Sequence, residues 1–136
     1  MEEVKKQGGK RKILVFGNPW VERDALPLKL LPRLRKAFPE IEFKEMVPEE
    51  DLQAEGRKLF ILDVVQGLRK AEVIEDLARL QTVKRVSLHF FDLAHNLQLL
   101  KATDLIDSAK IFGVPMGLEE ATAFRQVSAL IKASLP

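Results

Sequence analysis

The sequence lacks several of the features on which enzyme chemistry commonly relies. It contains no cysteine, which excludes disulfide bonds, thiolate metal sites and a cysteine nucleophile. The dinucleotide-binding fingerprint Gly-x-Gly-x-x-Gly and the phosphate-binding loop ending in Gly-Lys-Ser or Gly-Lys-Thr are both missing, which argues against a nucleotide site. None of the serines lies in a Gly-x-Ser-x-Gly elbow. The usual nucleophilic and nucleotide-dependent chemistries are therefore disfavoured.

The chain also lacks long apolar stretches and a large excess of either charge. No apolar stretch approaches the ~18 residues needed to cross a bilayer, and the net charge of +2 gives little ground for a nucleic-acid surface. The early basic residues precede no apolar leader region, so we expect a flexible basic tail over 1–11 rather than a signal peptide. We expect a single α/β domain over 12–136, in the cytoplasm, with no nucleic acid or membrane as partner.

What the sequence does have is an alternation of strand-like and helix-like segments. Continuous apolar runs of strand length predict strands buried on both faces, and one alternating segment predicts a half-exposed edge strand. Leucines at spacings of three and four predict the helices. The expected strands are 12–17, 41–46, 58–65, 84–88 and 109–114, and the expected helices are 25–38, 72–80, 91–107 and 119–134. This order predicts a three-layer, doubly wound α/β fold, a mostly parallel sheet of about five strands with helices on both faces.

Three of the predicted strands are followed by a side chain that can bind a metal. Asp24 follows the first strand and its turn, Asp63 ends the apolar run that starts at Leu59 within the strand 58–65, and His89 follows the run 84–88. Ligands of open parallel sheets collect outside the carboxyl ends of the strands. If these strands are neighbours, two carboxylates and one imidazole meet at one edge. Such a set suits nickel, zinc, manganese or iron and leaves coordination positions open for a substrate.

Each of these residues also has a simpler interpretation. Asp24 alone would more often cap the helix that follows it, and Asp63 alone would more often accept backbone hydrogen bonds in a turn. A lone His89 would more often be a structural histidine. Their joint placement at the ends of separate strands favours a shared site, because three independent coincidences would otherwise be required.

The segments that carry these residues resemble those of the hydrogenase maturation proteases. The family opens with a strand, then Gly-Asn, and an acidic ligand seven residues after the glycine, which here is the segment from Gly17-Asn18 to Asp24. Its second ligand ends an apolar strand, as Asp63 does. Its third is a histidine followed by a leucine-rich helix, which matches His89 in preference to His95.

The resemblance implies a nickel-dependent endopeptidase that cleaves the C-terminal extension from the precursor of a nickel–iron hydrogenase large subunit. Asp24, Asp63 and His89 would be the metal ligands, and Gly17 and Asn18 would contact the substrate. The nickel would be read from the precursor, with another divalent ion able to bind in isolation. Hydrolysis would proceed through a metal-polarised carbonyl or a metal-activated water, without a serine or cysteine nucleophile.

The chain departs from the family pattern at several positions. Arg23 replaces the first acid of the usual pair, and the segment Met46-Val47-Pro48-Glu49-Glu50 stands in place of a glycine-rich stretch that shapes the peptide cleft. The missing glycine-rich stretch motivates one alternative, a non-catalytic relative that binds a metal or a metallated partner. A further alternative is a small-molecule-binding α/β module in which Asp24 and Asp63 are structural caps.

Overall fold

The structure is a computed structural model that describes residues 11–17, 25–46, 51–75 and 88–135, with the backbone alone for 88–92. Five strands form one sheet in the order β2-β1-β3-β5-β4. The strands are β1 (Arg11–Val15), β2 (Ile41–Glu45), β3 (Lys58–Val64), β4 (Glu72–Ile74) and β5 (Ser108–Val114). All neighbouring pairs are parallel except β4 with β5. The doubly wound, mostly parallel α/β fold predicted from the sequence is confirmed.

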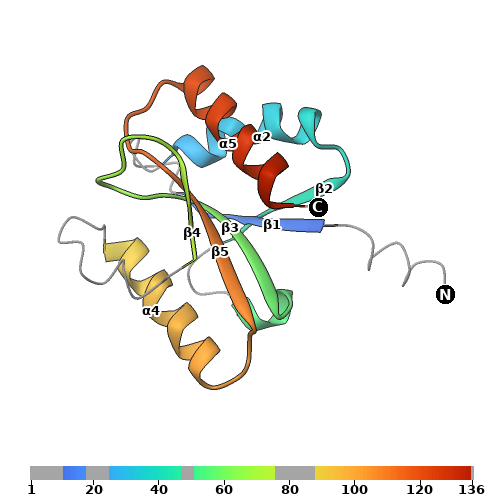
Figure 1. Cartoon of the computed structure of the whole chain (residues 1–136), viewed down its shortest axis with the longest axis vertical. Coiled ribbons are helices and arrows are strands. Elements are labelled where there is room, and N and C mark those ends of the chain that lie inside the picture. The colour runs from blue at the N-terminus through green and yellow to red at the C-terminus, as the bar shows by residue number, and fades with distance from the viewer. Residues whose placement is uncertain (1–10, 18–24, 47–50, 76–87, 136) are drawn as a thin grey trace.

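The helices α2 (Leu26–Ala37), α4 (Leu88–Ala102) and α5 (Glu120–Ser134) cover the two faces of the sheet. Figure 1 shows α2 and α5 together on one side and α4 on the other. Each side has its own apolar core, because successive strand residues point to opposite faces. Leu62 and Phe112 belong to the core beneath α2 and α5, whereas Ile61 and Ile111 belong to the core beneath α4.

Two predicted elements are corrected by the structure. The expected helix 72–80 is wrong at its start, because residues 72–74 form the short strand β4 and pair with β5 in antiparallel register. The expected helix 91–107 begins at Leu88 and ends at Ala102. Asp104 then adopts a positive φ of 64°, a left-handed conformation that stops a helix much as glycine does. Of the expected strand 84–88, residues 84–87 lie outside the described residues.

The winding of the chain places a switch point between β1 and β3. From β1 the chain passes through α2 to β2 on one side of β1, and it then returns to β3 on the other side. Crevices at the carboxyl ends of the two strands that flank such a reversal are the usual ligand sites of open α/β sheets. Gly17 follows β1 and Asp63 is near the end of β3, so both lie at this edge of the sheet.

Candidate metal centre at the carboxyl edge

Asp63 is buried at the carboxyl end of the central strand β3. The residue is 3% exposed, and its neighbours in the strand are apolar. Its Oδ1 accepts a hydrogen bond of 2.8 Å from the backbone N–H of Val64. Burying a carboxylate costs free energy unless charge or hydrogen bonds compensate for it, so a buried acid at this edge marks a functional position more strongly than an exposed one would.

The side chain of Asp63 faces the same side of the sheet as α4. Because side chains alternate along β3, Asp63 points to the same face as Leu59 and Ile61. These two residues pack in the core beneath α4. The short turn from α4 into β5 makes the helix antiparallel to that strand, so its first turn lies toward the carboxyl edge (Figure 1). The backbone of His89 is in this first turn. Asp63 and the start of α4 thus share one face and one edge of the sheet.

The competing histidine occupies a different position. His95 is exposed and lies further along α4, six residues or about 9 Å from position 89 at the helical rise of about 1.5 Å per residue. An exposed position in mid-helix, away from the strand ends, does not suit a ligand shared with the buried Asp63. His89 as the third ligand stays a prediction, because its side chain lies outside the described part of the chain.

Asp24 and Asn18 also lie outside the described residues. The described helix α2 that follows Asp24 has Ala25 at its N-cap position, and the alanine side chain makes no capping hydrogen bond. Gly17 is half-buried directly after Phe16, whose backbone N–H donates to the carbonyl of Leu62 at 2.9 Å. This bond ties the end of β1 to β3 one residue before Asp63, so the two ends are held together.

Two similar turns form the rim of this edge. Gly67 lies three residues after the end of β3 with φ 97°, and Gly117 lies three residues after the end of β5 with φ 79°. Glycine adopts such left-handed angles without the steric cost that a side chain adds. Because β3 and β5 end in register at Val64 and Val114, the two turns begin side by side.

The turn after β3 is anchored from the opposite face of the sheet. The backbone N–H of Ala71 donates to Oε1 of Gln126 on α5 at 2.8 Å, and this contact is partly buried. It fixes the end of the segment 65–71, which begins two residues after Asp63. Gln126 could not be predicted as this partner from the sequence, because a glutamine in an amphipathic helix carries no signal for a distant backbone partner.

Of the three predicted metal ligands, only Asp63 has a side chain within the described residues. No group of three His, Asp or Glu side chains that could hold a metal is found within the described ranges, and two of the three predicted ligands have side chains outside them. Asp63 fits the predicted site in chemistry and place, because a carboxylate oxygen is a common ligand of divalent ions and the switch point is the expected location. The same ranges contain no helix long and apolar enough to cross a membrane.

Comparison with solved structures identifies proteins of the same fold. The chain is similar to the hydrogenase maturating endopeptidase HybD from E. coli, with a TM-score of 0.64, 19% identity, and coverage of 92% of this chain and 94% of that one. An endopeptidase from Escherichia coli gives a TM-score of 0.59 at 19% identity, covering 90% and 94% of the two chains. The hydrogenase 3 maturation protease gives 0.57 at 19% identity, covering 90% and 88%.

The match extends over nearly the whole of each chain. No protein-family model and no curated protein matches the sequence, so the likeness is one of fold and is not visible in overall sequence similarity. The resemblance deduced from the strand-end residues is confirmed at the level of the fold: this chain has the fold of the hydrogenase maturation endopeptidases.

Proposed function

We propose that the chain is a metal-dependent endopeptidase that removes the C-terminal extension from the precursor of a nickel–iron hydrogenase large subunit. The observation that carries the proposal is the buried carboxylate of Asp63 at the switch point. It lies in a fold that hydrogenase maturating endopeptidases share over nine-tenths of the chain. Neither the fold nor the carboxylate alone indicates this function, but together they support the proposal that Asp63 is an oxygen ligand for a substrate-borne metal.

In the proposed site Asp24 and Asp63 supply carboxylate oxygens, and His89 supplies an imidazole nitrogen. Gly17 follows β1 at the same edge, where a glycine would leave room for the backbone of a bound peptide, and Asn18 is the second proposed substrate contact. The nickel belongs to the substrate, so its presence in the precursor is the signal for cleavage. A divalent ion held by such a set polarises a carbonyl group or activates a water molecule.

The proposal is tested by incubating the chain with hydrogenase large-subunit precursor that carries nickel and with the same precursor lacking it. We expect cleavage of the nickel-bearing precursor only. Asp63→Asn keeps the size of the side chain and removes its charge, and it should lower the cleavage rate at least roughly 100-fold. Asp51→Asn changes an exposed acid at another position and should leave the rate unchanged. Equal cleavage of the precursors with and without nickel, or cleavage that persists in Asp63→Asn, would contradict the proposal.

A pull-down with the same two precursors, combined with the cleavage assay, separates the non-catalytic alternative from the peptidase. The segment Met46-Val47-Pro48-Glu49-Glu50 in place of a glycine-rich stretch favours a chain that binds the nickel-bearing precursor without cutting it. In that case a pull-down would recover the precursor in a nickel-dependent way, Asp63→Asn would abolish recovery, and no shortened product would form.

A further inference from the structure

The opposite edge of the sheet contains a cleft that the proposed peptidase site does not use. The cleft has a volume of about 310 Å³ and is lined by residues at the starts of β1 and β3 and by Glu55. This volume is near the lower end of the range of about 300–1,000 Å³ that is typical of small-molecule sites. Its lining residues are Arg11, Lys12, Leu14, Glu55, Lys58, Leu59 and Phe60. We call it the amino-edge cleft.

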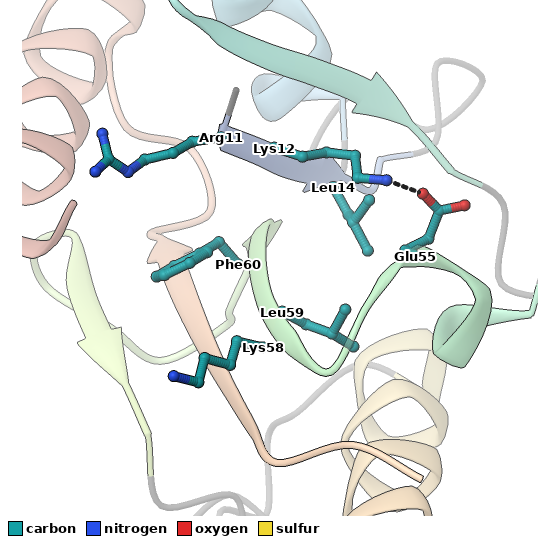
Figure 2. Close-up of a pocket in the computed structure, with 7 residues that line it drawn as sticks. All are labelled: Arg11, Lys12, Leu14, Glu55, Lys58, Leu59 and Phe60. Atoms are coloured by element: carbon teal, nitrogen blue, oxygen red, sulfur yellow. Dashed lines mark hydrogen bonds and ion pairs between the residues drawn. The ribbon is translucent and has the colours of Figure 1, made fainter. Parts of the chain in front are cut away.

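The cleft exists because the two central strands diverge. The strand β1 pairs with β2 over five residues, and β3 pairs with β5 over seven. Between β1 and β3 the register covers only Leu14–Ile61 and Val15–Leu62. The residues that precede these pairs, from Arg11 on β1 and from Lys58 on β3, do not pair with each other. Figure 2 shows the starts of the two strands lying apart with the lining side chains around the opening.

The residues that line the amino-edge cleft come from both faces of the sheet. Alternation puts Arg11, Lys58 and Phe60 toward the face covered by α2 and α5, as Figure 2 shows by their common direction. The almost fully buried Leu14 and Leu59 close the cleft on the face that α4 covers, where they belong to the apolar core. The cleft therefore combines an apolar floor and an aromatic wall with basic groups at its mouth.

The charge at the mouth is positive, although one acid lines the cleft. Glu55 forms ion pairs of 2.7 Å with both Lys12 and Lys44, and its side chain is 9% exposed. One carboxylate is thus surrounded by two ammonium groups, and it cannot neutralise Arg11 or Lys58 as well. Lys58 lies near Asp107, whose carboxylate is already bound by Arg57 at 2.8 Å. An excess of positive charge remains around the opening.

We propose that the amino-edge cleft binds a small organic anion, a phosphate or carboxylate group carried on an aromatic or apolar body. Arg11 and Lys58 bind the anionic group, for which arginine offers paired donors that match phosphate and carboxylate oxygens. Phe60 and the leucine floor contact the apolar body. From Lys58 to Asp63 the strand β3 extends about 16 Å, at a strand rise of about 3.3 Å per residue. The cleft is therefore separate from the proposed metal site.

The proposal is tested by amide NMR titration of the full chain with four probes: phenyl phosphate, benzoate, inorganic phosphate and benzyl alcohol. Phenyl phosphate or benzoate should cause saturable shifts at Lys12–Leu14 and Lys58–Phe60 and leave Asp63 unperturbed. Inorganic phosphate and the neutral alcohol should each bind more weakly, because the first lacks the apolar body and the second lacks the anionic group. A preference between phenyl phosphate and benzoate identifies the anionic group.

Charge-removing variants give the control. Arg11→Gln together with Lys58→Gln should raise the Kd of the aromatic anion roughly tenfold or more, because two charge-assisted contacts are lost. Arg69→Gln together with Lys70→Gln removes the same two residue types from exposed positions in the turn after β3 and should leave the Kd unchanged. Absence of saturable shifts, shifts confined to the carboxyl edge, or equal weakening by both double variants would overturn the proposal.

Discussion

Asp63 on β3 lies directly beside Gly113 on β5 in the parallel register of the two strands. A Cβ atom at Gly113 would come within 2.9 Å of Cγ2 of Val65 and 3.0 Å of Cδ1 of Leu68. The glycine therefore lets the segment that follows Asp63 fold closely over β5. The buried carboxylate and the missing side chain are parts of the same local arrangement.

Gly113→Ala should destabilise the chain through this close approach. The added methyl group forces Val65 and Leu68 to shift, and overpacking of this kind should lower the free energy of unfolding by about 1–2 kcal/mol. Urea denaturation measures the change. In a background of Val65→Ala, where the nearest atom is removed, the penalty of Gly113→Ala should shrink, and an undiminished penalty would show that the contact is not its cause.

The hydrogen bond between Gln126 and the backbone of Ala71 should control the turn that follows Asp63. Gln126→Met removes the acceptor at similar length, so the exchange rate of the Ala71 amide should rise roughly fivefold, as expected for a lost bond worth about 1 kcal/mol. Gln126→Glu keeps an acceptor oxygen and should retain slow exchange. Equal exchange in both variants would mean that packing, rather than the hydrogen bond, holds the turn.

Glu55 should stabilise the amino edge in a pH-dependent way. Partial burial raises the pKa of Glu55, but hydrogen bonds from Lys12 and Lys44 outweigh it and leave the pKa below the ordinary value of 4.5. A carboxyl whose pKa is lowered by folding contributes stability above its unfolded pKa and loses it as the pH falls through the folded value.

Glu55→Gln should therefore lower the free energy of unfolding by about 1 kcal/mol at neutral pH. The difference from the wild type should fade as the pH falls below 4.5, the ordinary value for this carboxyl. Denaturation series at several pH values measure it. Glu42→Gln, which alters an exposed acid on β2, should cause little change, and a pH-independent loss in Glu55→Gln would contradict the electrostatic explanation.

The sequence predicted the long buried strands better than the short elements. The strands β3 and β5 consist mostly of apolar residues, which is the pattern expected of a strand buried on both faces. The three residues of β4 leave no such pattern, because pairing with β5 rather than local preference makes them a strand. The end of α4 depends on Asp104 adopting a left-handed conformation, which residue type alone does not specify.

The sites at the two edges of the sheet also differ in how far they could be predicted from the sequence. Asp63 could be identified from the sequence, because an acid at the end of an apolar strand is anomalous wherever the strand lies. The amino-edge cleft could not, since it arises from the short register between β1 and β3. That register is a property of strand packing, and the residues lining the cleft resemble ordinary strand starts in the sequence.

The measurement that most directly tests the central claim is calorimetric titration of the chain with nickel at near-neutral pH. The wild type and the variants Asp24→Asn, Asp63→Asn, His89→Ala and His95→Ala would be compared. We expect about one equivalent of bound nickel in the wild type and in His95→Ala, whose residue is exposed on α4. Binding should be lost in each of the other three variants, because each removes one ligand of a shared site. Nickel binding that survives Asp63→Asn and His89→Ala would contradict the proposed metal site.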